Sequence, residues 1–316
     1  MIAVAGAGAF GTALAVTLAR GGRDVTLWAR DPGQVAQMLR TRRNGRHLPD
    51  LFLPEKVSLT AEIAELSRAS VTLLAVPMQS MRMFLKENAQ GLNGTRLVAC
   101  CKGIDLQTGL GPWATMAAAC PASDLALLTG PGFAIDIAQG LPTALTLAGG
   151  SEALQAMLST STLRLYRTDD VVGAELGGAL KNVIAIAAGV AIGAGLGVSA
   201  RAALMTRGFA EMVRLSTSMG GRAETLAGLS GLGDLVLTTT SPQSRNFCYG
   251  VALGQGKEFD PDVTVEGAAT ALAVARLAQG RGIDMPISQM VADLIERKLR
   301  LSAAIDTLLS RPLKRE

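Results

Sequence analysis

The most informative pattern lies in residues 1–30, MIAVAGAGAFGTALAVTLARGGRDVTLWAR. An apolar run leads directly into Gly6-x-Gly8-x-x-Gly11, which is followed by a helix-forming segment and a second apolar run at residues 24–28. Gly6 allows a tight turn, Gly8 lets the backbone approach a pyrophosphate, and Gly11 lets the helix pack closely on the strand. Because all these parts lie within one unit of about 30 residues, the sequence predicts a dinucleotide-binding strand-helix-strand unit.

The same alternation continues beyond this unit. Short apolar runs, separated in the earlier part by helix-length segments, are found at residues 2–5, 24–28, 71–76, 97–101, 125–129 and 144–148. Near-continuous apolar strands that alternate with helices are typical of a parallel sheet covered on both faces. We therefore expect an α/β domain with a doubly wound, mainly parallel sheet.

The pattern changes near residue 173. Long Ala-rich segments with helical periodicity follow, without further strand-like alternation; they are residues 175–192, 201–219 and 265–281. We therefore expect a dinucleotide-binding domain over residues 1–173 and an all-helical domain over residues 174–316. No low-complexity linker separates them, which favours a packed junction.

Composition excludes several classes of protein. The chain has 316 residues, and its 30 Lys and Arg against 26 Asp and Glu give a formal charge of +4. Hydrophobic residues make up 49%, so a folded core is expected, while aromatic residues make up only 3%, which argues against single-stranded nucleic-acid binding. Four cysteines without a C-x-x-C pair predict no zinc site and no disulfide framework. The chain opens on a strand without a basic leader, so we expect a cytoplasmic protein.

One segment, residues 182–200, carries no charge and meets the length criterion of about 18 residues for a membrane helix. Its apolar residues are mostly Ala and Gly. Gly189, Gly193, Gly195 and Gly197 suit close helix packing and a helix end inside a protein. We therefore expect a core helix and no membrane insertion.

The end of the second apolar run predicts the form of the cofactor. An acidic residue there would accept a hydrogen bond from a free ribose 2′-hydroxyl, whereas Arg30 can pair with a 2′-phosphate. This favours NADP(H) over NAD(H), although Asp31 beside it keeps both open and an exposed Arg is also common as plain surface. The basic cluster that follows is either a solvated loop or a region that steers anions; it consists of Arg40, Arg42, Arg43, Arg46 and His47.

Two lysines are the candidate acids and bases. His47 is the only histidine and lies in a loop-like stretch that we expect at the surface. Hydride transfer to a ketone needs a proton donor for the growing alkoxide, and a lysine can serve if burial or a neighbouring cation lowers its pKa. Lys102 follows a strand at the carboxyl edge, where open α/β sheets bind ligands. Lys181 lies in an otherwise apolar helix, where a cation is costly without an anionic ligand. Each alone could also be an ordinary surface lysine.

Two loops have the composition of anion sites. Residues 129–134, TGPGFA, follow a strand, and their glycines free backbone N–H groups. Residues 238–246, TTTSPQSRN, concentrate hydroxyl groups, and in Ser244-Arg245-Asn246 an Arg is flanked by two hydrogen-bonding side chains. Such a combination can bind phosphate, although hydroxyl-rich loops are usually only turns.

The order of these motifs indicates a family. GAGAFGTALA, CKGI, GPGFA, GGALKNVIAIAAG, LGDLVLT, QSRN and VEG follow one another as in bacterial glycerol-3-phosphate dehydrogenase, and the sequence resembles this family from Gly6 to beyond Gly267. The resemblance implies a Rossmann domain joined to a helical domain, NAD(P)(H) as cofactor, and a homodimer. The implied reaction is reversible reduction of dihydroxyacetone phosphate to sn-glycerol 3-phosphate for phospholipid synthesis.

The resemblance also implies roles for individual residues. Lys181 would be the proton donor or acceptor at the C2 oxygen, and Lys102 would lie close to nicotinamide and substrate. The implied substrate-binding residues are Lys102, Gly130, Gly132, Lys181, Asp234, Ser244, Arg245 and Asn246. The cofactor-binding residues expected from the glycine loop and the resemblance are Gly6, Gly8, Ala9, Phe10, Gly11, Arg30, Lys102, Ala134, Arg245, Thr264 and Glu266. No metal is implied.

The sequence departs from the family pattern at a few positions. Gly132 replaces the usual hydroxyl-bearing or larger residue, Asp136 stands where Glu is common, and His47 stands where the family often has an aromatic residue. The segment before Val265 is shortened. The first two departures bear on substrate affinity.

Two other functions fit parts of the pattern. A β-hydroxyacid or ketopantoate-type reductase would share the fold and a catalytic lysine, but it would bind a carboxylate and would not need Ser244-Arg245-Asn246. A nicotinamide-sensing regulatory protein would keep the glycine loop but would have no use for Lys102 and Lys181.

Overall fold

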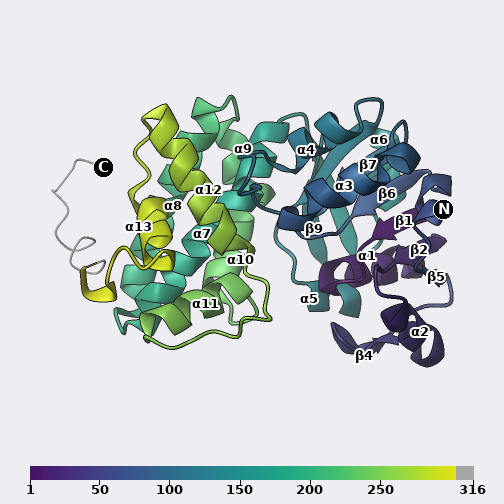
Figure 1. Cartoon of the computed structure of the whole chain (residues 1–316), viewed down its shortest axis with the longest axis horizontal. Coiled ribbons are helices and arrows are strands. Elements are labelled where there is room, and N and C mark those ends of the chain that lie inside the picture. Colours follow the sequence, from purple (N-terminus) through teal and green to yellow (C-terminus); the bar gives the residue numbers. More distant parts are fainter. Residues whose placement is uncertain (304–316) are drawn as a thin grey trace.

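The computed structural model describes residues 1–303, which form a sheet domain and a helical domain side by side (Figure 1). The strands of the main sheet are β1 (Ile2–Ala5), β2 (Val25–Trp28), β5 (Val57–Thr60), β6 (Val71–Leu74), β7 (Arg96–Ala99), β8 (Asp124–Thr129), β9 (Thr143–Ala148) and β10 (Leu163–Thr168). They form one eight-stranded sheet in the order β10-β9-β8-β7-β6-β1-β2-β5. Neighbours are parallel except β8 and β9, which are antiparallel, so the predicted mainly parallel Rossmann sheet is confirmed.

Helices cover both faces of this sheet. In β1, Ile2 and Val4 pack into one apolar cluster while Ala3 and Ala5 pack into another, because successive side chains of a strand point to opposite faces. The first cluster includes side chains of α1 (Ala9–Arg20), α2 (Pro32–Thr41) and α6 (Glu152–Leu158); the second includes those of η1 (Ile63–Arg68), α3 (Met78–Leu92) and α4 (Pro112–Ala119). The short helix α5 (Ala134–Gln139) packs against α1.

Four strands outside the predicted set complete the sheet domain. The edge strands β5 and β10 are amphipathic; in β10, Leu163 and Leu165 are buried while Arg164 and Tyr166 are exposed. The sequence prediction relied on continuous apolar runs and therefore missed strands that are buried on one face only. A small hairpin, β3 (Arg43–Asn44) and β4 (Leu48–Phe52), carries Arg43, Arg46 and His47 of the basic cluster, while Arg40 lies in α2 and Arg42 at its end.

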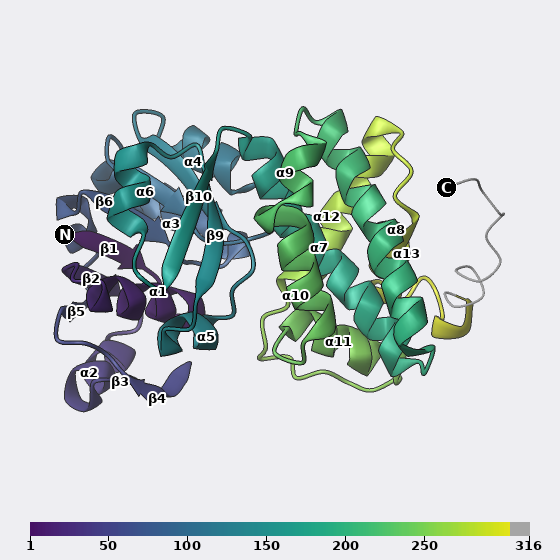
Figure 2. The same cartoon turned by 180° about the vertical axis from the view of Figure 1, so that it is seen from behind.

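The central helix of the helical domain is α7 (Val171–Gly193), which contacts the other long helices around it (Figure 2). These elements are α8 (Gly197–Ser218), α9 (Ala223–Ala227), η2 (Leu229–Gly233), α10 (Asp234–Thr240), α11 (Arg245–Gly254), α12 (Glu266–Arg281) and α13 (Pro286–Ile295). Among residues 1–303, α7 alone has the length and composition of a membrane span, but 89% of its most apolar window is buried inside the protein. It is a core helix. A Cβ at Gly189 would lie 2.2 Å from the carbonyl oxygen of Phe247, so glycine is what allows α11 to pack this closely.

The two domains meet between β10 and α7. Asp170 accepts hydrogen bonds at 2.8 Å from the backbone N–H groups of both Gly173 and Arg222, so it caps the start of α7 and ties the α8–α9 turn to it. The expected boundary at residue 173 lies in the first turn of α7, and the division there stays a prediction.

Candidate active site

A cleft of about 1220 Å³ is lined by residues of both domains at the carboxyl end of the sheet. This is the edge at which open α/β sheets bind ligands. Of the predicted site residues, those in its lining are Gly6, Gly8, Ala9, Phe10, Arg30, Lys102, Gly132, Ala134, Lys181, Ser244, Arg245, Asn246, Thr264 and Glu266. Gly11, Gly130 and Asp234 are not among the residues that line the cleft.

The glycine loop has the shape that a pyrophosphate group requires. Gly6 has φ +115°, and a Cβ there would lie 2.7 Å from the carbonyl oxygen of Ala75. A Cβ at Gly11 would lie 2.0 Å from the carbonyl oxygen of Gly6, so α1 can approach the loop this closely only because residue 11 is a glycine. No protein atom lies within 4 Å of a Cβ built at Gly8, which leaves the cleft side of the loop open at the start of α1. Free N–H groups of a helix start favour an anion there. These residues fit a nicotinamide dinucleotide.

Two residues at the end of β2, Arg30 and Asp31, could contact the ribose of the cofactor, and they differ in their partners. Asp31 accepts a 2.8 Å hydrogen bond from the Gly33 N–H as the cap of α2, and it pairs with Arg46 at 2.9 Å. The hydrogen bond from Gly33 and the charge of Arg46 hold the pKa of Asp31 below its usual range. Arg30 is exposed in the cleft and forms no hydrogen bond or ion pair with any residue that the structure describes. It is therefore available to a ligand.

The basic cluster divides into two parts. Arg42 donates hydrogen bonds to backbone oxygens of residues 53, 54 and 57, and Arg43 lies over the ring of Phe52 at 3.8 Å, so these two hold the local fold. Arg46 and His47 line the cleft instead. Partial burial and the charges of Arg46 and Arg245 lower the pKa of His47. His47 is exposed as expected, but it lies on the wall of the cleft.

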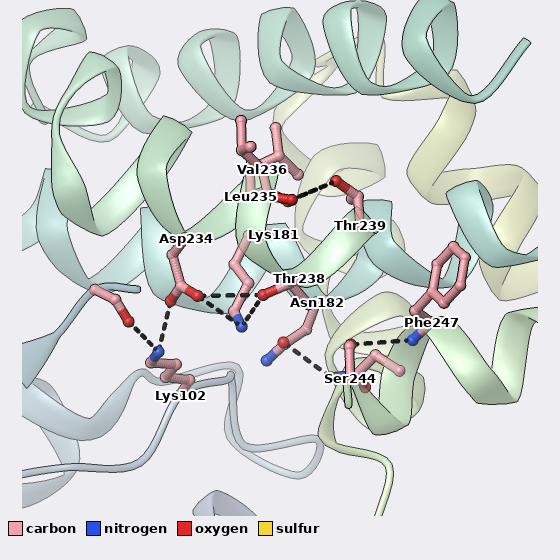
Figure 3. A network of polar contacts seen from close by, with 12 residues as sticks. Lys102, Lys181, Asn182, Asp234, Leu235, Val236, Thr238, Thr239, Ser244 and Phe247 are labelled. Carbon is pink, nitrogen blue, oxygen red and sulfur yellow. Dashed lines mark hydrogen bonds and ion pairs between the residues drawn. The ribbon is translucent and has the colours of Figure 1, made fainter. Parts of the chain in front are cut away.

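Both candidate lysines bind the same carboxylate (Figure 3). Lys102 Nζ lies 2.5 Å from Asp234 Oδ2, and Lys181 Nζ lies 3.1 Å from Asp234 Oδ1. Lys102 also donates to the carbonyl oxygen of Gly130 at 2.9 Å. The three side chains are 14%, 9% and 2% exposed for Lys102, Lys181 and Asp234 respectively, so the cluster is nearly closed to water. It contains two cations and one anion.

The electrostatics of this cluster tune Lys181. The pKa of Lys181 is lowered to about 8, chiefly by burial; the charge of Asp234 opposes this shift, while the charge of Lys102 adds to it. Burial would raise the pKa of Asp234, but the charges and hydrogen bonds of the two lysines outweigh burial and lower it. A lysine with this pKa, held in a fixed position, meets the requirements of a general acid or base near neutral pH.

Thr238 is a member of this cluster that sequence reasoning did not single out. Its Oγ1 accepts a hydrogen bond from Lys181 Nζ at 2.7 Å and donates one to Asp234 Oδ1 at 3.2 Å. The expectation that residues 238–246 form one loop is wrong, because Thr238 lies in the last turn of α10 and Arg245 begins α11. The signal was available, since residues four apart on a helix, such as Asp234 and Thr238, share a face.

The three residues predicted to bind phosphate, Ser244, Arg245 and Asn246, differ in what their side chains contact. Ser244 caps α11 by accepting from the Phe247 N–H at 3.2 Å. Asn246 donates to Asn182 Oδ1 at 2.8 Å and accepts from the Gly267 N–H at 2.9 Å, so its amide joins α11, α7 and α12. Arg245 forms no hydrogen bond or ion pair within residues 1–303, and it lines the cleft. Arg245 thus leaves a free guanidinium in the cleft.

Gly132 and Glu266 complete the lining on opposite sides. A Cβ at Gly132 would lie 3.0 Å from Ile137 Cδ1 and 3.1 Å from Thr143 Cγ2, so a larger residue there would contact α5 and β9. Burial raises the pKa of Glu266, against the charges of Arg245 and both lysines. No group of three or more His, Cys, Asp or Glu that could hold a metal ion is found in the part of the chain that the structure describes.

A glycine loop at the sheet edge and a lysine pair on one buried carboxylate define a two-domain, nicotinamide-dependent dehydrogenase. Two family models match consecutive parts of the chain, described as NAD-dependent glycerol-3-phosphate dehydrogenase N-terminus over residues 1–155 and C-terminus over residues 170–306. The chain belongs to the NAD-dependent glycerol-3-phosphate dehydrogenase family.

Individual relatives agree with this assignment. A protein of Cereibacter sphaeroides named glycerol-3-phosphate dehydrogenase [NAD(P)+] is 62% identical, with 100% of each chain covered. The crystal structure of a glycerol-3-phosphate dehydrogenase from Coxiella burnetii has a TM-score of 0.93 at 36% identity and covers 98% of each chain. A ketopantoate reductase from Ralstonia eutropha has a TM-score of 0.63 at 16% identity, covering 94% of this chain and 98% of its own, which shows a shared fold alone.

Proposed function

We infer that the protein is an NAD(P)-dependent glycerol-3-phosphate dehydrogenase. It transfers hydride reversibly between NAD(P)H and C2 of dihydroxyacetone phosphate, giving sn-glycerol 3-phosphate for phospholipid synthesis. The observation that carries this conclusion is the pairing of Lys102 and Lys181 on Asp234 in a cleft that also contains the glycine loop.

We propose the following roles for the chain's own residues. Bound NAD(P)H supplies the hydride. Lys181 donates a proton to the C2 oxygen in reduction and accepts it in oxidation, because its pKa of about 8 makes both forms accessible near neutral pH. Lys102 adds a second positive charge that stabilises an alkoxide-like transition state. Asp234 and Thr238 hold the Lys181 ammonium in place.

We assign the phosphate group of the substrate to the part of the cleft that Arg245 lines. The free guanidinium of Arg245 can bind it with two parallel hydrogen bonds. Ser244 and Asn246 support Arg245, since one caps its helix and the other joins that helix to α7 and α12. We also assign Gly130 and Gly132 to the substrate site: Gly132 lines the cleft, and the carbonyl oxygen of Gly130 helps to hold Lys102 there.

The structure bears differently on the two rival functions. A reductase for a carboxylate substrate would share the fold, but it would not need Ser244 and Asn246 beside Arg245 in the lining of the cleft. A nicotinamide sensor would not need two lysines held on one buried carboxylate, since burying such charges is costly. Both observations support the dehydrogenase.

The direct test is oxidation of NADPH, and separately of NADH, by the purified protein on addition of dihydroxyacetone phosphate. We expect turnover with both cofactors, followed as loss of the reduced nicotinamide absorbance, and faster turnover with NADPH. Absence of turnover in protein that binds both cofactors would contradict the proposed substrate.

Arg30 is expected to set the preference for NADPH. Arg30→Ala should raise the KM for NADPH by about 10- to 100-fold, because a charge-assisted contact to the 2′-phosphate contributes about 1.5–3 kcal/mol. The KM for NADH should change by less than about 3-fold, since NADH has no such phosphate. Arg40→Ala, at an exposed position outside the cleft, is the control. An unchanged ratio of the two KM values would assign the preference to other residues.

We propose two further properties, a location and an oligomeric state. A cytoplasmic location is supported by the four cysteines, all of which are free, as is usual in a reducing compartment. A homodimer is proposed from the family resemblance.

A further inference from the structure

The segment that carries Lys102 passes from one domain into the other. Lys102 follows β7 of the sheet domain, but Ile104 is 2% exposed and belongs to the apolar core of the helical domain. Gly103 between them has φ +137°, and a Cβ there would lie 3.0 Å from Thr270 Oγ1 of α12. The position of the Lys102 ammonium therefore depends on how this junction segment is held.

Gln79, in the first turn of α3, holds the segment with both atoms of its side-chain amide. Its Nε2 donates to the carbonyl oxygen of Ile104 at 2.8 Å, and its Oε1 accepts from the N–H of Leu106 at 3.0 Å. One bond in each direction determines which way the amide points. Arg82, one turn later on α3, contacts side chains of the same segment, with its Nε 3.5 Å from Asp105 Oδ2 and its guanidinium bonded to Gln107, whereas Gln79 binds the backbone. Gln79 also lines the cleft.

We propose that Gln79 is a positioning residue for Lys102 in the reduction of the ketone. Its two hydrogen bonds fix the segment that places the Lys102 ammonium against Asp234 and the carbonyl oxygen of Gly130. Gln79 acts through Lys102 and need not touch the substrate. This proposal rests on the proposed function.

Loss of the two hydrogen bonds has a specific consequence for Lys181. The charge of Lys102 is one of the causes that lower the pKa of Lys181, so a Lys102 that moves away lets this pKa rise. A misplaced catalytic group also lowers turnover, since a shift of about 1 Å can cost about 100-fold. A side chain with a merely structural role would not change the pH profile in this way.

The first test is Gln79→Met, which keeps the length of the side chain and removes the amide. We expect kcat to fall by about 10- to 100-fold, the KM for NADPH to change by less than about 3-fold, and the apparent pKa of the kcat profile to move upward. Gln155→Met is the matched control, because Gln155 makes a similar 2.8 Å bond to the carbonyl oxygen of Leu165, between α6 and β10. It should leave kcat and the pH profile unchanged. An unshifted profile in Gln79→Met would overturn the proposal.

The second test repeats Gln79→Met in a Lys102→Ala background. We expect no further loss of kcat, because the residue that Gln79 positions is gone. Losses that multiply would overturn the proposal. If Gln79→Met does not fold, Gln79→Glu, which keeps the acceptor for the Leu106 N–H, takes its place in the same cycle. Wild-type turnover of dihydroxyacetone phosphate is measured first, since its absence contradicts the proposed function and leaves the cycle to be run with the true substrate.

Discussion

Lys181→Ala should lower kcat by about 1,000-fold or more, while the affinity for NADPH stays within about 3-fold of wild type. The variant loses both the proton donor and a charge that stabilises the transition state, and general acid catalysis alone contributes about 10²- to 10⁴-fold. Lys181 lies on α7 of the helical domain beside Asp234, whereas the glycine loop belongs to the sheet domain, so the dinucleotide should still bind. Steady-state kinetics and a fluorescence titration with NADPH measure the two quantities.

The pH dependence separates this role from a structural one. Reduction needs protonated Lys181, so kcat of the wild type should fall as the pH rises through about 8, the value to which burial lowers the pKa of Lys181. Oxidation needs the neutral amine, so its kcat should rise over the same range. Both limbs should disappear in Lys181→Ala, and Lys298→Ala, at an exposed lysine, should keep them. Wild-type-like turnover in Lys181→Ala would contradict the assignment.

Asp234→Asn should damage both stability and turnover. It leaves Lys102 and Lys181 facing each other without their anion, and removal of one partner from a buried ion pair costs about 3–5 kcal/mol. We expect kcat to fall by about 100-fold, and the apparent pKa of its profile to move below that of the wild type, because the charge of Asp234 raises the pKa of Lys181. Urea unfolding and a pH series of kcat measure these changes.

The control for Asp234→Asn is an ion pair that is exposed to solvent. Asp169 pairs with Arg222, but its side chain is 86% exposed, so Asp169→Asn should change the free energy of unfolding by less than about 1 kcal/mol. If Asp234→Asn were as mild as this control and kept its pH profile, Asp234 would not be the residue that holds the two lysines.

Much of the fold follows from local patterns. The glycine loop with its flanking strand and helix, six strands of the sheet and the long helices of the second domain are all visible as periodic apolar residues. The edge strand β10 was not predicted from the sequence, because only one of its faces is buried and it therefore lacks a continuous apolar run. The helix α7 passes the length and composition criterion for a membrane span, and only the helices packed around it show that it is a core helix.

The sequence alone provides the chemical candidates: an isolated lysine in an apolar helix, a lysine at a strand end, and a glycine loop before a helix. These can be recognised because propensity, periodicity and the cost of burying a charge act over a few neighbouring residues. The tertiary structure decided which candidates meet. Two lysines from distant parts of the chain, Lys102 and Lys181, converge on the carboxylate of Asp234. The side chains of Asp31 and Asn246 instead hold helices in place. Hydrogen bonds and ion pairs depend on distance in space, and the packing of the two domains sets that distance.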